Sequence, residues 1–289
     1  MKAMLLKGKN QPLVLETVPD PVPGPGEAVA RVLSCGAGLT IHHVRAGRVP
    51  VQYPRILGHE ISAEIVATGE GVKRLKAGDA VTAYFYLTCG HCFWCRINRE
   101  TLCENFGGYV GRECDGGYAE YIKLPAENFI PLPENMNHKK HAAEIGVICD
   151  AIATPLKVTR KARVMPTDTV AVIGAGGGLG VHMLMVSRWA HARKVIAIDT
   201  KASKFESCVK CGADATIDAS DGKVSEQLLE MTGGTGVDVV FDYVCTKQSI
   251  ESAIGGLNFG GRLVLLAGNS ARFDADGPAI MRKEIEVMG

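Results

Sequence analysis

The chain has 289 residues, 46% of them hydrophobic, and its 32 basic and 31 acidic residues leave a formal net charge of +1. This length and composition suffice for two domains with hydrophobic cores. The near-zero charge argues against a nucleic-acid or membrane-surface partner, and we expect neither a signal peptide nor a membrane span. Ten cysteines without a secretion signal predict reduced or metal-bound thiols and a cytoplasmic protein.

The first half of the chain is predicted to form a mostly β domain. Residues 2–33 read as short strands, broken by the proline- and glycine-rich run 21–26. A hairpin is predicted over 64–81, where glycines mark the turns. A further strand is predicted over 116–122.

From about His141 the hydrophobic pattern becomes helical and then alternates between strands and helices. A helix is predicted over 142–164, interrupted at Pro155, as the bridge to a second domain. Six strands separated by helices predict an α/β architecture with a doubly wound parallel sheet. These strands are 170–173, 195–198, 215–217, 237–242, 262–266 and 285–288.

A glycine-rich turn over 174–180 is the strongest functional signal in the second domain. It follows a buried strand and opens a helix, so backbone N–H groups and the positive end of the helix dipole can bind a pyrophosphate. The next strand ends in Asp199, whose carboxylate can hold both ribose hydroxyls of NAD and repels the 2′-phosphate of NADP, although nearby Lys201 favours NADP. The alternative is a tight turn that binds nothing. The predicted cofactor-binding residues here are Gly174, Gly176, Gly177, Gly178, Leu179, Gly180 and Asp199.

Four cysteines between residues 89 and 103 have the spacing of metal ligands. Cys89, Cys92, Cys95 and Cys103 form a C-x2-C-x2-C-x7-C pattern on one short loop. Four thiolates can close a tetrahedron around zinc and leave no position for water, so the expected site is structural. The alternative is free or disulfide-paired cysteines, and a reducing compartment disfavours the disulfides.

Together these features resemble the zinc-containing medium-chain alcohol dehydrogenases over nearly the whole chain. The four-cysteine lobe, Gly58-His59-Glu60, the hairpin and the glycine turn follow the family's order. The resemblance implies a GroES-like catalytic domain over 1–155, an NAD-binding Rossmann domain over 156–289, hydride transfer in the cleft between them, and a homo-oligomer formed through the Rossmann domain. The family continues beyond the last predicted strand and returns to the first domain, so we expect a fragment or a shortened form.

The resemblance also assigns the ligands of a catalytic zinc, with one departure. His59 matches the family's second ligand, and Glu60 is its usual neighbour. Asp150 matches the third, because it opens the family's pattern of ligand, three residues, threonine. The first ligand, a cysteine in the family, falls on Gly38. We therefore expect a weak or rebuilt site, with Glu60 as the third ligand. The alternative is that Cys35 swings in, which strand geometry disfavours.

A proton relay and further cofactor contacts are implied in the same way. Thr40 matches the hydroxyl that passes on the substrate proton, and His43 matches the relay histidine. Thr154 and Lys204 match cofactor contacts, the lysine at the ribose. Cys149 is expected to be a buried apolar cysteine.

Three functions are compatible with these residues. The first is a zinc-containing, NAD-dependent oxidoreductase that transfers hydride between a small alcohol and its aldehyde or ketone. The second is a zinc-independent reductase of activated alkenes, which Gly38 favours. The third is a nucleotide-binding relative without turnover.

Overall fold

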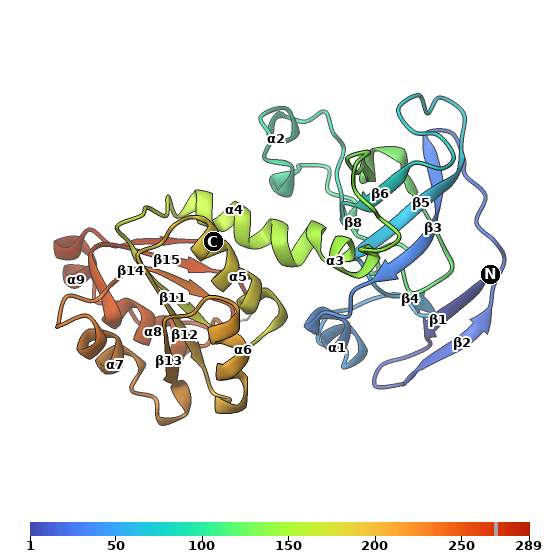
Figure 1. Cartoon of the computed structure of the whole chain (residues 1–289). Helices are drawn as coiled ribbons and strands as arrows, with labels where there is room; N and C mark the ends of the chain where they lie inside the picture. The colour runs from blue at the N-terminus through green and yellow to red at the C-terminus, as the bar shows by residue number, and fades with distance from the viewer. Residues whose placement is uncertain (269–270) are drawn as a thin grey trace. The chain divides into compact units, whose positions relative to one another are not determined.

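The computed structural model describes residues 1–268 and 271–289 and divides into two compact units, Met1–Asp150 and Ala151–Gly289 (Figure 1). The predicted fold class is confirmed, because a β-rich first unit is followed by a parallel sheet with helices. None of the helices in the described part of the chain has both the length and the apolar character needed to cross a bilayer.

The first unit is built from antiparallel strands in two main sheets, of order β10-β6-β5-β3-β9 and β2-β1-β4. The predicted hairpin is confirmed, since Ala63 lies opposite Val81 in adjacent strands. The strands are β1 (Lys2–Leu6), β2 (Leu13–Thr17), β3 (Glu27–Cys35), β4 (Arg55–Ile56), β5 (Ile61–Thr68), β6 (Ala80–Ala83), β9 (Tyr121–Pro125) and β10 (Phe129–Pro131), with a small pair β7 (Tyr86–Leu87) and β8 (Gly108–Tyr109). Three α-helices, α1 (Leu39–Arg45), α2 (Phe93–Arg96) and α3 (Ala142–Gly146), complete this unit.

The strand predicted over 116–122 is displaced, because β9 begins only at Tyr121. Gly116 and Gly117 instead donate backbone hydrogen bonds to Ile56 and Gly58, at 2.8 and 2.9 Å. These glycines therefore hold a loop against the segment that carries His59, rather than extending a sheet.

The second unit is a six-stranded parallel sheet of order β13-β12-β11-β14-β15-β16. All six predicted strands are present, although β15 begins at Leu257 rather than Arg262. They are β11 (Thr169–Ile173), β12 (Lys194–Asp199), β13 (Ala215–Asp218), β14 (Val237–Asp242), β15 (Leu257–Leu265) and β16 (Glu286–Met288). The α-helices are α4 (Ala153–Lys161), α5 (Gly178–Trp189), α6 (Phe205–Lys210), α7 (Val224–Met231), α8 (Lys247–Gly256) and α9 (Gly277–Lys283).

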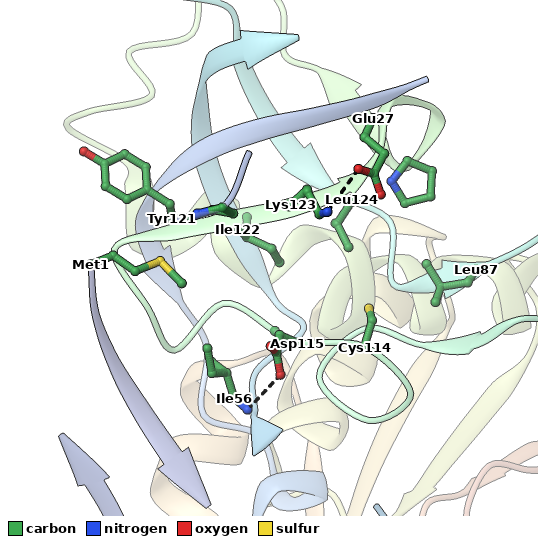
Figure 2. Close-up of a pocket in the computed structure, with 13 residues that line it drawn as sticks. Met1, Glu27, Ile56, Leu87, Cys114, Asp115, Tyr121, Ile122, Lys123 and Leu124 are labelled. Atoms are coloured by element: carbon green, nitrogen blue, oxygen red, sulfur yellow. Dashed lines mark hydrogen bonds and ion pairs between the residues drawn. The ribbon is translucent and has the colours of Figure 1, made fainter. Parts of the chain in front are cut away.

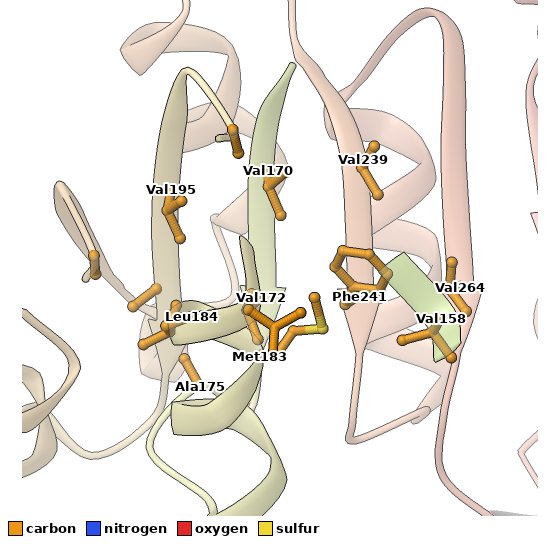
Figure 3. Packing of buried hydrophobic residues seen from close by; sticks show 14 of the residues in the cluster. Val158, Val170, Val172, Ala175, Met183, Leu184, Val195, Val239, Phe241 and Val264 are labelled. Carbon is orange, nitrogen blue, oxygen red and sulfur yellow. The ribbon is translucent and has the colours of Figure 1, made fainter. Parts of the chain in front are cut away.

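Alternate residues of the sheet pack into two cores, one on each face. Val172 and Phe241 face Met183 of α5 on one side, as Figure 3 shows. Ile198 and Ile250 belong to the core on the other side. A central strand buried on both faces reads as a continuous apolar run, which is why β11 was recognisable from sequence.

The helical stretch predicted over 142–164 is present between Ala142 and Lys161, three residues shorter than predicted, and its interruption is misplaced. A π-helical turn over Ile148–Ile152 separates α3 from α4, and Pro155 lies in the first turn of α4. Proline is tolerated there because the first N–H groups of a helix have no partner within it.

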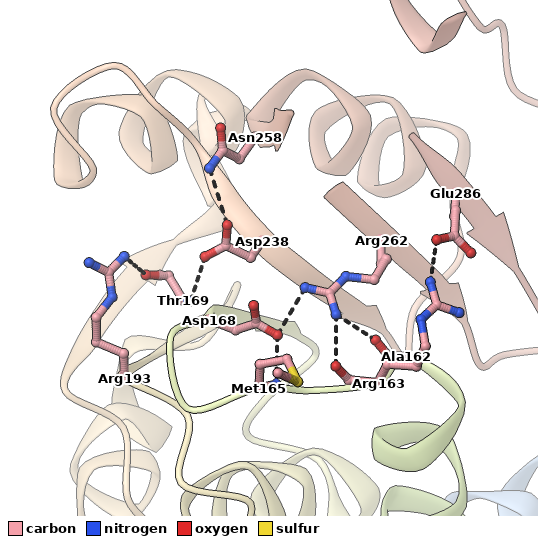
Figure 4. A network of polar contacts seen from close by, with 10 residues as sticks. All are labelled: Ala162, Arg163, Met165, Asp168, Thr169, Arg193, Asp238, Asn258, Arg262 and Glu286. Atoms are coloured by element: carbon pink, nitrogen blue, oxygen red, sulfur yellow. Dashed lines mark hydrogen bonds and ion pairs between the residues drawn. The ribbon is translucent and has the colours of Figure 1, made fainter. Parts of the chain in front are cut away.

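The end of α4 is fixed to the sheet by one arginine (Figure 4). Arg262 on β15 donates to the carbonyl oxygens of Ala162 and Arg163, at 2.7 and 2.9 Å. It also donates to Asp168 Oδ2 at 2.9 Å, and the Met165 N–H donates to the same oxygen at 2.8 Å. Arg262 thereby satisfies carbonyl groups that the end of a helix leaves without partners.

Candidate functional site

The turn between β11 and α5 brings glycines into close backbone contact. Gly174 has a φ of +78°, and a Cβ added to Gly180 would lie 2.3 Å from the Gly174 carbonyl oxygen. Neither position therefore accepts a side chain. Gly177 precedes the first residue of α5, so the first N–H groups of that helix are available to an anion.

Asp199, at the end of β12, lies directly at this turn. Its Oδ2 accepts from the Gly176 N–H at 2.9 Å, and its Oδ1 accepts from the Lys201 N–H at 3.1 Å. The Lys204 side chain covers Gly176, since a Cβ added there would lie 2.4 Å from Lys204 Cδ. The structure thus brings the predicted turn, acid and lysine together.

A cavity of about 190 Å³ adjoins Asp199. Its lining combines apolar side chains with hydroxyl and amide groups, a composition that suits a flat base joined to a ribose. Most of this lining was not predicted from sequence, because the residues come from separate loops and helix starts with no shared pattern. They include Val224, Val244, Thr246, Gln248 and Ser249.

The four cysteines of the lobe converge as a metal site requires. The Sγ atoms of Cys92 and Cys95 are 3.5 Å apart, those of Cys103 and Cys89 are 3.5 Å apart, and those of Cys92 and Cys103 are 4.0 Å apart. A tetrahedron with Zn–S bonds of about 2.3 Å has edges of about 3.8 Å. The donor set and its spacing therefore fit zinc.

Backbone contacts already favour a thiolate within the lobe. Hydrogen bonds from the His91 and Cys92 backbone lower the pKa of Cys89 to about 6. Desolvation and the neighbouring thiols raise the pKa of Cys95 to about 12. Adjacent thiols resist losing all their protons unless a cation is bound among them.

His59 and Asp150 meet although 91 residues separate them. His59 Nε2 lies 3.3 Å from Asp150 Oδ2, and the histidine is only 7% exposed. The Phe85 ring packs beside the imidazole, with centroids 5.0 Å apart. A buried histidine beside a carboxylate can share a proton or bind a cation.

Glu60 follows His59 in the chain, but the Glu60 carboxylate lies beside Gly36 and Gly38. A Cβ added to Gly36 would be 2.3 Å from Glu60 Oε2, and one added to Gly38 would be 3.7 Å from it. Among the described residues, the cysteine lobe is the only group with three or more donors close enough for one metal ion. As placed, His59 and Asp150 therefore do not complete a site with three protein ligands.

Cys35 does not join His59 and Asp150 as placed, so the structure gives no support to the alternative that it swings in to replace the missing cysteine. A Cβ added to Gly58 would lie 2.6 Å from the Cys35 Sγ, and one added to Gly117 would lie 2.9 Å from it. The thiol is thus packed closely against both glycines. Desolvation raises the pKa of the Cys35 thiol to about 12. The thiol packs with the core of the first unit. Cys149 is buried, as predicted.

The predicted relay residues Thr40 and His43 both lie in α1. Arg48 Nη1 lies 3.1 Å from His43 Nδ1. Because a guanidinium only donates, Nδ1 accepts, and the neutral ring carries its proton on Nε2. Partial burial, Arg48 and His42 lower the pKa of His43, which favours this neutral form. Thr154 lies in the first turn of α4, in the second unit.

A separate cavity of about 330 Å³ contains none of the predicted site residues (Figure 2). Ile56, Leu87 and Leu124 contribute apolar lining. Lys123 and Glu27 at its edge form an ion pair of 3.1 Å. Asp115, which also lines the cavity, pairs with Arg55 at 2.8 Å, so these charged side chains already have partners within the protein.

A β-rich unit with a four-cysteine lobe, followed by a parallel sheet with a dinucleotide-type turn, defines the class of two-unit dehydrogenases. Residues 24–134 match the alcohol dehydrogenase GroES-like domain, and residues 178–289 match the zinc-binding dehydrogenase domain. An alcohol dehydrogenase of Geobacillus stearothermophilus is 34% identical over 271 residues, covering 92% of this chain and 77% of the relative.

Solved structures agree with this class. The alcohol dehydrogenase TADH from Thermus sp. ATN1 superposes with a TM-score of 0.91 at 27% identity, covering 100% of this chain and 84% of the other. An Escherichia coli CFT073 alcohol dehydrogenase complexed with NADH gives 0.88 at 28% identity, covering 100% and 82%. A zinc-binding dehydrogenase from Sinorhizobium meliloti 1021 bound to NADP gives 0.89 at 28% identity, covering 100% and 83%.

The chain belongs to the zinc-containing medium-chain alcohol dehydrogenase family. This membership places it among the oxidoreductases that use a nicotinamide cofactor.

Proposed function

We propose that this chain is an NAD-dependent oxidoreductase that transfers hydride between an alcohol and its aldehyde or ketone. The observation that carries the proposal is the Asp199 carboxylate bonded to the glycine turn. A carboxylate there accepts hydrogen bonds from the two ribose hydroxyls of NAD and repels the 2′-phosphate of NADP. Gly174 to Gly180, Thr154 and Lys204 are the other proposed cofactor contacts. NAD bound at these residues supplies the hydride acceptor.

The chain's own residues provide a route for the substrate proton. The Thr40 hydroxyl accepts the alcohol proton and donates its own toward His43. His43 is suited to receive it because its lowered pKa keeps the ring neutral. As placed, Nδ1 accepts from Arg48 and Nε2 carries the ring proton. His43 can therefore take up a further proton only after the Arg48 contact is released or the ring changes tautomer.

Zinc has two different places in this proposal. Cys89, Cys92, Cys95 and Cys103 would hold one ion, which cross-links the lobe. His59 and Asp150, with Glu60 if its side chain turns away from Gly36, are the proposed ligands of a second, loosely held ion. As placed, these residues do not form a complete metal site.

We further propose that the protein is cytoplasmic and that it binds a small-molecule substrate. We also propose that copies of the chain form a homo-oligomer through the second unit. The support for excluding nucleic acid and membrane partners is the net charge of +1.

The test is a dehydrogenase assay with primary and secondary alcohols, using NAD and NADP in parallel, with and without a chelator. We expect reduction of NAD by at least one alcohol. Reduction of activated alkenes by NADPH, with no alcohol oxidised, would instead establish the zinc-independent reductase.

A further inference from the structure

The wall of the cavity beside Asp199 depends on a second acid, Asp242, at the end of β14. The Asp242 side chain is fully buried and belongs to none of the sites above. Its Oδ1 accepts from the N–H groups of Val244 and Cys245, at 2.8 and 2.9 Å. Its Oδ2 accepts from the Ser249 hydroxyl at 2.7 Å. All three partners donate, so the carboxylate acts only as an acceptor.

These partners shape the loop 243–246, which joins β14 to α8. Val244 and Ser249 line the cavity, whereas Asp242 does not. The loop also touches the glycine turn, because a Cβ added to Gly174 would lie 3.0 Å from Val244 Cγ2. Asp242 therefore lies behind the cavity wall and acts on the cofactor site only through the residues that it holds.

The backbone of Cys245 shows that this loop is held in place by its contacts. Its φ of +51° lies in the left-handed region, which is unfavourable for a residue with a side chain. The Cys245 Sγ lies 3.2 Å from the Asp242 carbonyl oxygen, and the Ala267 N–H donates to the same sulfur at 3.3 Å. Such a conformation persists only where the surroundings fix it, and the bond from the Cys245 N–H to the Asp242 carboxylate is one of the bonds that do so.

The same network fixes the first turn of α8. The Thr246 hydroxyl accepts from the Ser249 N–H at 3.1 Å, and the Ser249 hydroxyl accepts from the Thr246 N–H at 2.9 Å. This reciprocal cap satisfies N–H groups that the start of a helix leaves without partners. Because the Ser249 hydroxyl also donates to Asp242, the loop and the start of α8 are attached together to one buried acid.

We propose that Asp242 is a positioning residue for the adenosine half of the nicotinamide cofactor. The inference rests on the proposed function and adds to it a residue that does not line the cofactor cavity. Asp242 holds Val244 and Ser249 in a preformed wall, so that cofactor binding does not have to order the loop. The position of its acceptor atoms carries this role, and the charge of the carboxylate does not. No covalent bond is made or broken at Asp242.

Titration calorimetry with AMP, which carries only the adenosine half, measures this effect without turnover. We expect Asp242→Ala to weaken AMP binding about tenfold, since the loop loses three hydrogen bonds and must be ordered on binding. Fluorescence titration should show a similar loss for NADH and none for reduced nicotinamide mononucleotide, which lacks adenosine. Asp238→Ala is the matched control, because Asp238 accepts a 2.7 Å bond from the Thr169 N–H near the other end of β14.

Two further variants separate position from charge, and they decide the question even where Asp242→Ala fails to fold. Asp242→Asn keeps an oxygen for the two N–H groups, and its amide can donate to Ser249 while that hydroxyl donates to the Thr246 carbonyl oxygen, 3.1 Å away. Asp242→Glu keeps the charge but displaces the oxygens by one methylene. We expect Asp242→Asn to bind AMP within about twofold of the unmutated chain and Asp242→Glu to bind it about tenfold more weakly. The reverse order would overturn the inference.

The outcomes distinguish this inference from the proposed function. If AMP binding depends on Asp242 as expected but no alcohol is oxidised, the proposed function fails and the positioning role stands. If alcohols are oxidised while Asp242→Ala lowers only the melting temperature, or weakens AMP binding no more than Asp238→Ala does, the role of Asp242 is purely structural and the inference is overturned. An unmutated chain that binds neither AMP nor NADH would refute both.

Discussion

Asp199 accepts a 2.9 Å hydrogen bond from the N–H of Gly176, 23 residues earlier in the chain. The acid thus lies where a ribose and the adjoining phosphate would both be within reach. Replacing Asp199 with Ala removes the ribose acceptor and the repulsion of a 2′-phosphate.

We therefore predict that Asp199→Ala weakens NADH binding by about tenfold or more, the equivalent of one or two hydrogen bonds. NADPH binding should change less or improve. Fluorescence titration of both cofactors measures the change, with Asp218→Ala, at the end of the neighbouring strand β13, as the control. An unmutated protein that prefers NADPH would contradict the prediction.

The cysteine lobe should depend on zinc for its order. It contains few buried side chains besides Cys92 and Cys103. Cys92→Ala is expected to remove the tightly held zinc, lower the melting temperature and open Arg96 and Arg99 to trypsin. Elemental analysis and limited proteolysis measure these effects. Cys211→Ala, in the second unit, should change none of these three properties. A Cys92→Ala variant with full zinc content would refute the assignment.

Gly38 offers a direct test of the second metal site. A Cβ there would be in ordinary contact with Glu60 Oε2, at 3.7 Å, so a cysteine fits without strain on that side. We predict one chelator-resistant zinc in the unmutated chain and two in Gly38→Cys. Gly38→Ser is the matched control, because it adds similar bulk but a poor zinc ligand. Two resistant ions before mutation would show that the cysteine is dispensable.

The relay gives a prediction about pH. Burial contributes most to the lowered pKa of His43, and the positive charge of Arg48 contributes next. Removing that charge makes the imidazolium less unfavourable, so Arg48→Gln should raise the pKa of His43 toward its ordinary value.

If neutral His43 accepts the substrate proton, the acid limb of the kcat/KM profile should move to higher pH in Arg48→Gln. Arg45→Gln, an exposed arginine of the same helix, should leave the limb in place. An Arg48→Gln profile identical to that of the unmutated enzyme would remove His43 from the relay.

The second unit was largely predictable because its signals are local. A buried strand, a glycine turn and an acid at the end of the next strand are all contained within 169–199, and the structure brings them together. The four-cysteine pattern is equally local, and its sulfur atoms converge.

Features that depend on remote backbone contacts were not predictable. The Glu60 carboxylate lies where it does because Gly36 leaves space for it. The loop at Gly116 looks like a strand in sequence, but its N–H bonds to Ile56. Arg112 carries no motif, and its position over the Tyr109 ring depends on the fold of the loop after β8.

The close approach of Gly58 to Gly111 and Gly116 affects how this enzyme can diverge. No side chain can enter that contact without moving the backbone beside His59, so these positions tolerate little variation. Arg112 and Glu113 project from the same turn into a groove and are free of this restriction. Variation in this region is therefore confined to side chains that project away from the contact, while the backbone beside His59 stays fixed.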